Sequence, residues 1–284
     1  MTKITLEALA EAGASITISA ARLLELSQEP DNPTEPAEPI EPVVTLFDFG
    51  SGHDFIVADG QDPSTKGATW IDSFRKWGVR RLEKNGDGAI KRYVEGFTHV
   101  NFSSGLKLRA GFVDSELVGG MISTEDSMAF KRGSIETRAR IVSIPDGYHI
   151  WQALFPANGD RYPEIDISET VHGRANPSNG KVHWNHHLEG GASGDRCHAP
   201  AQRWEGICFA PIDAGWHTYR LESTDQGLWW FFDGQLVRTS PVPLTKAMYY
   251  VAAWEASGSW PGAITDQKAV ADFEIDFIRI EQAG

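Results

Sequence analysis

The chain has 284 residues, ten of them tryptophan, and a formal net charge of −13 at pH 7. Nucleic acid is a poor partner for so acidic a chain, because phosphate binding needs clustered Lys and Arg, and only isolated pairs such as Arg80-Arg81 occur. No apolar run approaches the roughly 18 residues of a membrane span. Composition therefore favours a globular protein that does not bind nucleic acid and does not span a membrane.

Residues 1–28 are predicted to form a small N-terminal unit. Leu6–Ala12 has the pattern of a short helix that ends near Gly13, and a second helix is expected over residues 20–27. Glu7 and Glu11 interrupt any apolar signal-peptide region, so no conventional secretory leader is expected. A unit this small buries too little surface to fold alone. It is either a weakly ordered leader or a point of self-association or tethering.

Residues 29–43 are predicted to be an extended linker. Prolines recur every third residue, at positions 30, 33, 36, 39 and 42, and five acidic residues lie among them. Polyproline II has three residues per turn, so this spacing suits it, and like charges favour extension. At about 3.1 Å per residue the spacer reaches roughly 40 Å. It would hold residues 1–28 away from a domain formed by residues 44–284.

Residues 44–284 predict an all-β domain. Short alternating runs are separated by Gly, Asp, Asn and Ser, and many short strands of this kind indicate a sandwich or jelly roll. Two cysteines, Cys197 and Cys208, bracket a loop-like segment; we favour a disulfide over two free thiols. The predicted strands are Thr45–Phe49, His99–Phe102, Leu106–Phe112, Ser134–Val142, Lys181–His186, His217–Ser223, Leu228–Phe232, Met248–Ala253 and Ala271–Ile280.

Three carboxylates, Glu164, Asp166 and Glu169, lie within six residues of one another. In a strand Glu164 and Asp166 share a face, but Glu169 has the opposite parity. One extra residue at Ile167-Ser168, a β-bulge, would bring all three together, and bulges are common beside active sites. Clustered carboxylates push their pKa values apart, as a paired acid and nucleophile require. The alternative is an exposed acidic strand face or a cation site.

The segment 164–169 resembles the E-x-D-x-x-E signature of glycoside hydrolase family 16, in the bulged form of laminarinases, agarases and related enzymes. The resemblance runs from about residue 47 to residue 281 and implies a β-jelly roll of two curved antiparallel sheets, concanavalin-like, whose concave face carries the cleft. Six further segments match the family in the right order: 120–124, 130–140, 216–219, 231–234, 259–262 and 273–280.

The resemblance implies an endo-acting retaining glycoside hydrolase that cleaves β-linked polysaccharide by double displacement. Glu164 would be the nucleophile and Glu169 the general acid/base, with Asp166 tuning the pair. This chemistry requires no cofactor. The covalent intermediate would also allow transfer to an acceptor sugar, so transglycosylation is the nearest related activity.

Four further residues fall in the family's cleft segments and are expected to contact substrate: Trp151, His183, Trp260 and Glu255. The first three match the family, whereas Glu255 is an unusual acid at its position. Trp151 would stack on a sugar ring, although a core position is the alternative. His183 would hydrogen-bond Glu169. The adjacent pair His186-His187 would point to opposite faces of a strand, which disfavours a zinc site here.

The resemblance also implies a structural Ca²⁺ held by the Asp276 side chain and the Gly105 carbonyl. The acidic domain favours neutral polymers over sulfated ones, so the expected substrate is a β-glucan, a galactan or a bacterial exopolysaccharide. The competing interpretation is a non-catalytic carbohydrate-binding or adhesion protein on the same fold, for example one tethered to a virus particle. The presence of all three acids argues against it, because binding alone needs no acid/base pair.

Overall fold

The computed structural model describes the backbone of residues 43–48, 75–76, 92–93 and 98–101, and the residues 105–125, 128–173, 179–190, 194–257 and 260–283 in full. The predictions for the N-terminal unit and for linker residues 29–42 lie outside these ranges. Strand β1 (Val43–Asp48) already includes Val43, so the sandwich begins one residue earlier than predicted.

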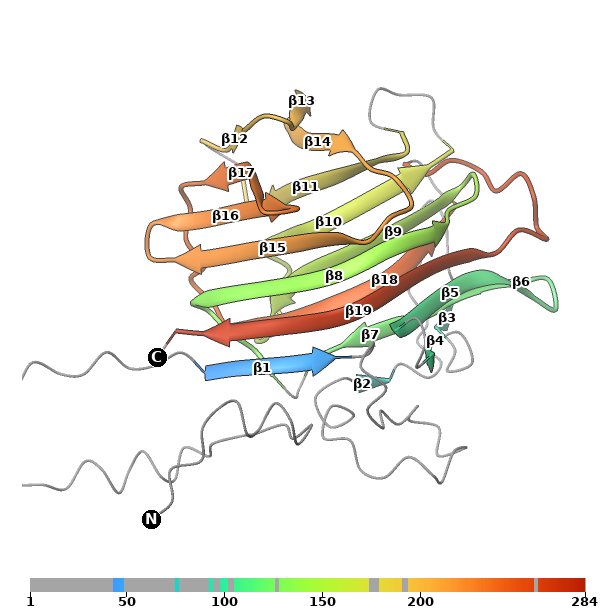
Figure 1. Cartoon of the computed structure of the whole chain (residues 1–284), viewed down its shortest axis with the longest axis horizontal. Coiled ribbons are helices and arrows are strands. Elements are labelled where there is room, and N and C mark those ends of the chain that lie inside the picture. Colours follow the sequence, from blue (N-terminus) through green and yellow to red (C-terminus); the bar gives the residue numbers. More distant parts are fainter. Residues whose placement is uncertain are drawn as a thin grey trace, which may run out of the picture.

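The described residues form a sandwich of two β-sheets, as the strand pattern predicts (Figure 1). The first sheet has 11 strands, and its pairs are antiparallel except that of β3 with β6. Its order is β12 (Arg196–Cys197), β17 (Gln235–Ser240), β16 (Gly227–Phe232), β15 (His217–Thr224), β8 (Gly133–Ser143), β19 (Ala271–Gln282), β5 (Gly105–Val113), β6 (Glu116–Gly119) and β3 (Arg92–Tyr93), with β1 also paired to β19 and β4 (Thr98–Asn101) to β5.

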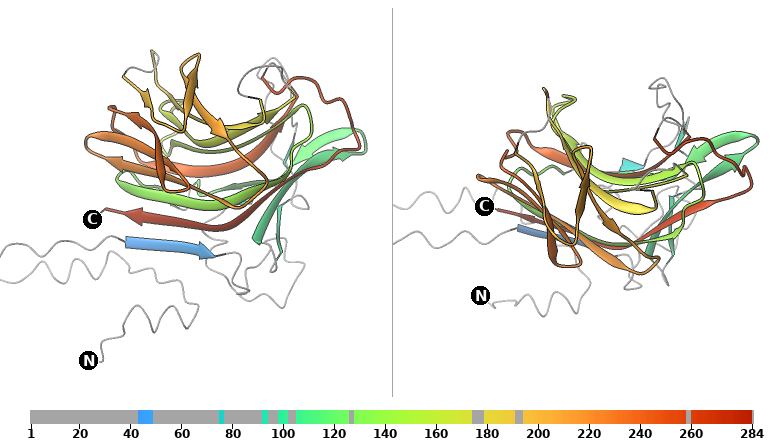
Figure 2. Two further views of the ribbon diagram at one scale, coloured as in Figure 1. Left: turned by 45° about the horizontal axis from the view of Figure 1, so that its top comes forward. Right: turned by 90° about the horizontal axis from the view of Figure 1, so that it is seen from above.

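The second sheet has eight antiparallel strands and carries the predicted acidic segment near its middle. Both sheets curve in the same sense, which makes the outer face of the second sheet concave (Figure 2). Its order is β13 (Gln202–Trp204), β14 (Ile207–Pro211), β11 (Lys181–His187), β10 (Glu164–His172), β9 (Tyr148–Pro156), β18 (Met248–Ala256), β7 (Met121–Ser123) and β2 (Arg75–Lys76).

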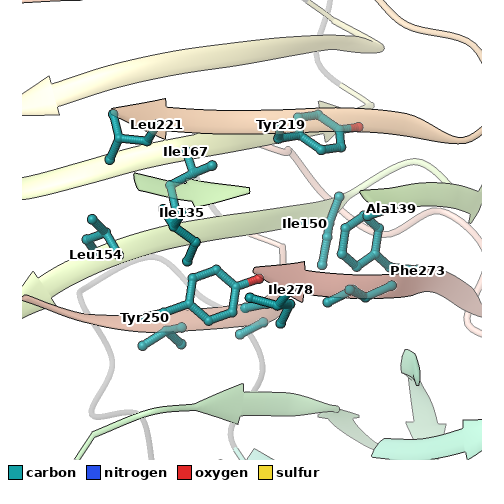
Figure 3. Packing of buried hydrophobic residues seen from close by; sticks show 14 of the residues in the cluster. Ile135, Ala139, Ile150, Leu154, Ile167, Tyr219, Leu221, Tyr250, Phe273 and Ile278 are labelled. Atoms are coloured by element: carbon teal, nitrogen blue, oxygen red, sulfur yellow. The ribbon is translucent and has the colours of Figure 1, made fainter. Parts of the chain in front are cut away.

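One hydrophobic core fills the space between the sheets (Figure 3). Strand β8 shows its origin, because every second residue from Ile135 to Ile141 is buried, Thr137 among them, while the residues between these positions are partly exposed. Leu154 of β9 meets this layer from the second sheet and is fully buried, which stabilises the fold by about 1.5 to 3 kcal/mol. The second sheet is thus anchored on one face, and its concave face is left for a site.

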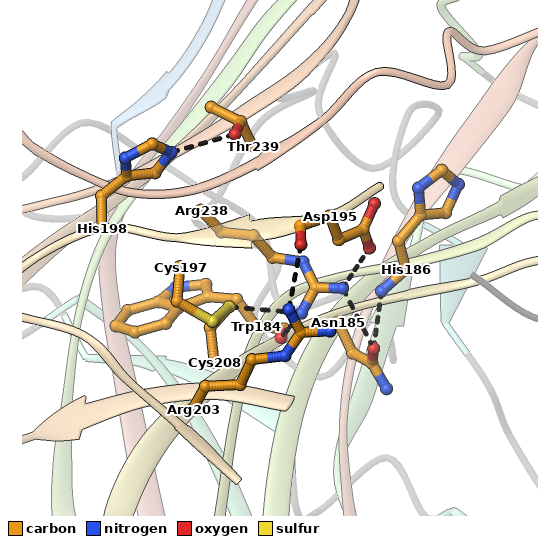
Figure 4. Close-up of a disulfide and its surroundings, with 10 residues drawn as sticks. All are labelled: Trp184, Asn185, His186, Asp195, Cys197, His198, Arg203, Cys208, Arg238 and Thr239. Atoms are coloured by element: carbon orange, nitrogen blue, oxygen red, sulfur yellow. Dashed lines mark hydrogen bonds and ion pairs between the residues drawn. A yellow bond between two sulfur atoms is a disulfide. The ribbon is translucent and has the colours of Figure 1, made fainter. Parts of the chain in front are cut away.

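All nine predicted strands are present, each within a few residues of its expected ends. The predicted disulfide is confirmed, since Cys197 of β12 is bonded to Cys208 of β14 (Figure 4). The short strands β2, β3, β6, β7, β12, β13 and β14 were not predicted, because two to five residues are too few to show an alternation. The longer strands β9 and β17 were not predicted either. The described part of the chain holds no helix long and apolar enough to cross a membrane.

Candidate active site

A β-bulge in β10 brings the three predicted carboxylates onto the concave face. Against β9, Asp166 pairs with Ala153 and Ser168 with Gln152, so Ile167 is the extra residue. Against β11, the register shifts at the same place, between Asp166 and Glu169. Ile167 and Ser168 are buried on the core side, and the Ser168 hydroxyl accepts a hydrogen bond of 2.8 Å from the side-chain amide of Gln152. The bulge predicted at Ile167-Ser168 is therefore confirmed.

Asp166 is the most deeply buried of the three acids, with a side chain only 3% exposed. Burial and the neighbouring charge of Glu169 raise its pKa to about 7. Burial and the charge of Asp166 likewise raise the pKa of Glu164 to about 7. Near neutral pH these carboxylates therefore hold protons that exposed acids would have lost, and they titrate as a coupled group.

His187 supplies positive charge at this end of the cluster. It is paired with Glu164 across β10 and β11, and its Nε2 lies 3.1 Å from Oδ2 of Asp166. The hydrogen bond to Asp166 raises the pKa of His187 to about 9 despite partial burial, so the ring is a cation at neutral pH. The imidazolium fixes Asp166 in place and offsets part of the negative charge of the cluster.

His149 plays the corresponding part at the other end, beside Glu169. Its Nε2 lies 3.2 Å from Oε1 of Glu169, and its Nδ1 lies 3.5 Å from Oε2 of Glu255. Burial alone would lower the pKa of His149, but contacts with the two carboxylates outweigh it and raise the pKa to about 9. A buried imidazolium thus joins the predicted acid/base to Glu255, a half-buried acid on β18.

Trp260 and His183 pack around His149. The Trp260 ring is edge-on to the His149 ring at 4.6 Å and to the His183 ring at 5.4 Å, measured between centroids. His183 faces Glu169 across β10 and β11, as expected, but its Nδ1 lies 3.1 Å from the backbone carbonyl oxygen of Glu169. It has no exposed surface, so in this structure His183 supports the strand and Trp260 covers it.

Trp151 lies on the concave face opposite Glu169 in the pairing of β9 with β10, and its side chain is only partly buried. Its ring packs edge-on against Phe155 at 5.9 Å, and Phe155 lies 6.0 Å from Tyr249. These three partly buried rings form an aromatic row beside the carboxylates. Trp151 is partly buried and also packs against the hydrophobic core, whereas Trp184 and Trp254 are fully buried core residues.

The residues expected to hold calcium lie far from this cluster, on the first sheet. Gly105 and Asp276 are adjacent, since a Cβ at Gly105 would lie 3.2 Å from the Cα of Asp276. However, the Asp276 carboxylate is paired with the guanidinium of Arg138. A calcium ion would have to displace this cation, so these donors fit calcium poorly.

Only one group among the described residues has metal-ligand spacing. Glu164, Asp166 and His187 each offer one ligand atom, and the three atoms lie within 4.8 Å of one another. His187 already forms an ion pair with Asp166 there. We therefore interpret the group as a proton-sharing cluster.

Sequence reasoning missed two residues of the site, His149 and His187. The alternation of side chains along a strand could have placed both histidines on the concave face. His149 lies two residues before Trp151 and must share its face, and His187 lies two residues beyond Asn185, the partner of Asp166. What parity does not give is the pairing of neighbouring strands that sets each ring against a particular carboxylate.

The concave sheet of this jelly-roll sandwich carries neighbouring carboxylates whose contacts differ, with Asp166 beside His187 and Glu169 beside His149. Such an arrangement is typical of a glycosidase. Comparison with known proteins gives the same class. The family model described as "Glycosyl hydrolases family 16" matches residues 91–279, and the chain belongs to this family.

A curated protein is similar in sequence to part of the chain. The curated endo-1,3-1,4-beta-glycanase ExsH of Rhizobium meliloti (strain 1021) is 28% identical over 171 residues, which are 58% of this chain and 33% of that protein. The chain thus spans about a third of the length of this relative.

Two solved structures are similar over most of the chain. The laminarinase catalytic domain of Thermotoga maritima MSB8 has a TM-score of 0.62 at 17% identity, covering 85% of this chain and 98% of the other. The laminarinase of Flavobacterium sp. UMI-01 has a TM-score of 0.60 at 20% identity, covering 75% and 94%. These likenesses show the fold.

Proposed function

We propose that this chain is an endo-acting retaining glycoside hydrolase that cuts a neutral β-linked polysaccharide by double displacement. The observation that carries the proposal is the bulge at Ile167, which sets Glu164, Asp166 and Glu169 on one concave face. Membership of family 16 supports it, as do the names of the relatives, a 1,3-1,4-beta-glycanase and two laminarinases. The negative net charge of the chain, −13 at pH 7, favours an uncharged polysaccharide over a sulfated one, because sulfate would be repelled.

Glu164 acts as the nucleophile in this mechanism. Its carboxylate attacks the anomeric carbon while Glu169 protonates the leaving oxygen, and a covalent glycosyl-enzyme forms. Burial and, second, the charge of Asp166 make ionised Glu164 less stable than an exposed glutamate, which favours its conversion to an uncharged ester. Trp151 packs beside the reacting sugar as a stacking surface.

Glu169 changes role between the two steps, and His149 assists the change. After Glu169 has lost its proton, the His149 imidazolium at 3.2 Å stabilises the carboxylate. The same carboxylate then takes a proton from the water that hydrolyses the ester. Glu255, on the other side of His149, keeps the ring charged and oriented.

The test is reducing-end release from laminarin, mixed-linkage glucan, agarose, carrageenan, xyloglucan and a bacterial exopolysaccharide, with the Glu164→Gln variant as control. Release from one polymer that the variant abolishes supports the proposal and identifies the substrate. Proton NMR of the first product tests retention, because an inverted anomer contradicts double displacement. Wild-type turnover by Glu164→Gln would refute the nucleophile assignment.

The acid/base assignment has its own test. Glu169→Ala should be inactive on polymer but rescued by azide on an aryl glycoside with a good leaving group, since azide needs no general base. A chain that binds a polymer without cutting any would instead be a binding protein on the same fold.

A further inference from the structure

Another β-bulge lies on the first sheet, at the acid that was expected to hold calcium. In the pairing of β19 with β8, Ile275 is opposite Ala139 and Phe277 is opposite Arg138, so Asp276 is the extra residue. Ile275 is fully buried in the core, whereas Asp276 and Phe277 are both partly exposed. The bulge therefore turns the Asp276 carboxylate to the outer face of the sheet, beside the residue that follows it.

The side chain that meets this carboxylate comes from the neighbouring strand. Strand β8 lies between β19 and β15 in the first sheet (Figure 1). On the outer face of β8, the guanidinium of Arg138 pairs with the carboxylate of Asp276. The same guanidinium carbon lies 4.9 Å from the centroid of the Trp216 ring, directly before β15. Arg138 thus makes an ion pair toward one neighbouring strand and a cation–π contact toward the other.

The contact with Trp216 suits a guanidinium and not a calcium ion. Ca²⁺ takes about six to eight oxygen ligands, and an indole ring offers none. A planar guanidinium pairs with a carboxylate and also stacks on an aromatic face. Within the described ranges, Asp276 belongs to no group of three His, Cys, Asp or Glu side chains with metal-ligand spacing. The surroundings of Asp276 therefore match the arginine that is present.

The other acids of β19 are paired with basic side chains in the same way. Buried Glu274 accepts hydrogen bonds of 2.8 and 2.6 Å from Arg140 and lies 3.0 Å from Nζ of Lys107. Opposite charges on neighbouring strands stabilise a sheet, so basic side chains of the protein itself balance this row of acids. The remaining pairs are Asp272 with Arg109, and Glu281 with Arg220 and with Arg279.

We propose that the guanidinium of Arg138 serves in place of a structural calcium ion, so that the stability of the sandwich does not depend on calcium. A cation is still required there, because the bulge leaves the Asp276 carboxylate only 22% exposed. The backbone of Gly105 adjoins the bulge, since a Cβ at Gly105 would lie 2.3 Å from the carbonyl oxygen of Ile275. Removing the Arg138 charge should therefore leave oxygen atoms that accept Ca²⁺. This inference goes beyond the proposed function and does not rest on it.

The test is thermal unfolding of the intact chain by circular dichroism, with excess EDTA or with about 10 mM CaCl₂, which exceeds the dissociation constants of weak protein calcium sites. Sodium chloride keeps the ionic strength equal. Arg138→Gln removes the charge beside Asp276. Arg109→Gln is the matched control, because it breaks the pair with Asp272 on the same face, and the two arginines are 38% and 39% exposed. Threonine, which favours strands, replaces glutamine at both positions should either variant fold poorly.

We expect the wild-type midpoint to agree within about 1 °C in EDTA and in calcium, since no ion has to bind. Both variants should unfold at lower temperature than wild type in EDTA. Calcium should raise the midpoint of Arg138→Gln by about 2 °C or more and leave the control unchanged, because only the first variant gains a site in the folded state.

Three results would overturn the inference. They are a wild-type midpoint that falls in EDTA, an Arg138→Gln variant as stable as wild type, and a calcium response of this variant no larger than that of Arg109→Gln. The measurement needs no substrate, so it is independent of whether the protein cuts any polymer.

Discussion

Replacing Asp166 with asparagine should move the acidic limb of the activity profile to lower pH. The substitution keeps the shape of the side chain and removes its charge. Glu164 must be ionised to attack, and its pKa is raised to about 7 by burial first and by the charge of Asp166 second. Wild-type kcat/KM should therefore fall as the pH drops through about 7, because the nucleophile gains a proton.

The size of the change follows from the spacing of the cluster. Carboxylate oxygens of Glu164 and Asp166 lie within 4.8 Å, at which two unit charges interact by roughly 3 kcal/mol in an effective dielectric of about 20. His187 neutralises part of the Asp166 charge, and the burial effect remains in the variant. We therefore expect a fall of about one pKa unit, equivalent to about 1.4 kcal/mol. The fraction of ionised Glu164 at pH 6 would rise from about a tenth to about a half.

The assay is kcat/KM against pH, each profile scaled to its own plateau. Scaling is needed because Asp166→Asn also removes the contact with His187 and should lower the plateau. Asp213→Asn is the matched control, since Asp213 is an exposed acid outside the cluster. An acidic limb that stays in place or moves to higher pH in Asp166→Asn, with the control unchanged, would refute the electrostatic account of Glu164.

Three further predictions concern stability and binding. Because its pKa is raised, Glu164 is neutral more readily in the folded protein than in the unfolded chain, so the protein loses stability as the pH rises from the usual glutamate range through about 7. In denaturant unfolding, Glu164→Gln should therefore be more stable than wild type by about 2 to 3 kcal/mol at pH 8 and equally stable at pH 4. The paired change Cys197→Ala and Cys208→Ala opens a loop with a sequence separation of 11 and should cost about 3 kcal/mol in the same assay, and a loss below 1 kcal/mol would contradict it. Trp151→Ala should raise KM about tenfold with kcat within about threefold, partly restored in Trp151→Phe, as expected for a stacking surface; a loss of stability at unchanged KM would instead indicate a packing role.

Rules of strand geometry explain what could be predicted from the sequence. Side chains along a strand alternate between its two faces almost without exception, so in a regular strand Glu169 would face away from Glu164. One extra residue is required to bring them to the same face, and the bulge at Ile167 supplies it. Cys197 and Cys208 bracket a short loop-like segment, and this spacing likewise predicted the disulfide that joins β12 to β14. In both cases residues close in sequence decide the outcome.

Contacts between distant strands explain what was missed. His149 meets Glu255 because β9 pairs with β18, more than a hundred residues later, and this pair faces Glu169 on β10. Nothing local in the sequence around Tyr148–Phe155 records that order of strands. The same limit applies to His183, whose strand and face were predicted but whose partner is the backbone carbonyl of Glu169 rather than its carboxylate.

His186 and His187 are consecutive residues of β11, but they serve opposite faces of the second sheet. Successive side chains of a strand point to opposite faces, so His187 reaches Asp166 while His186 lies beside Trp230 and Ser240 on the core side. The backbone of β11, which β10 and β14 hold on either side, therefore sets His187 against the carboxylates and keeps His186 in the core.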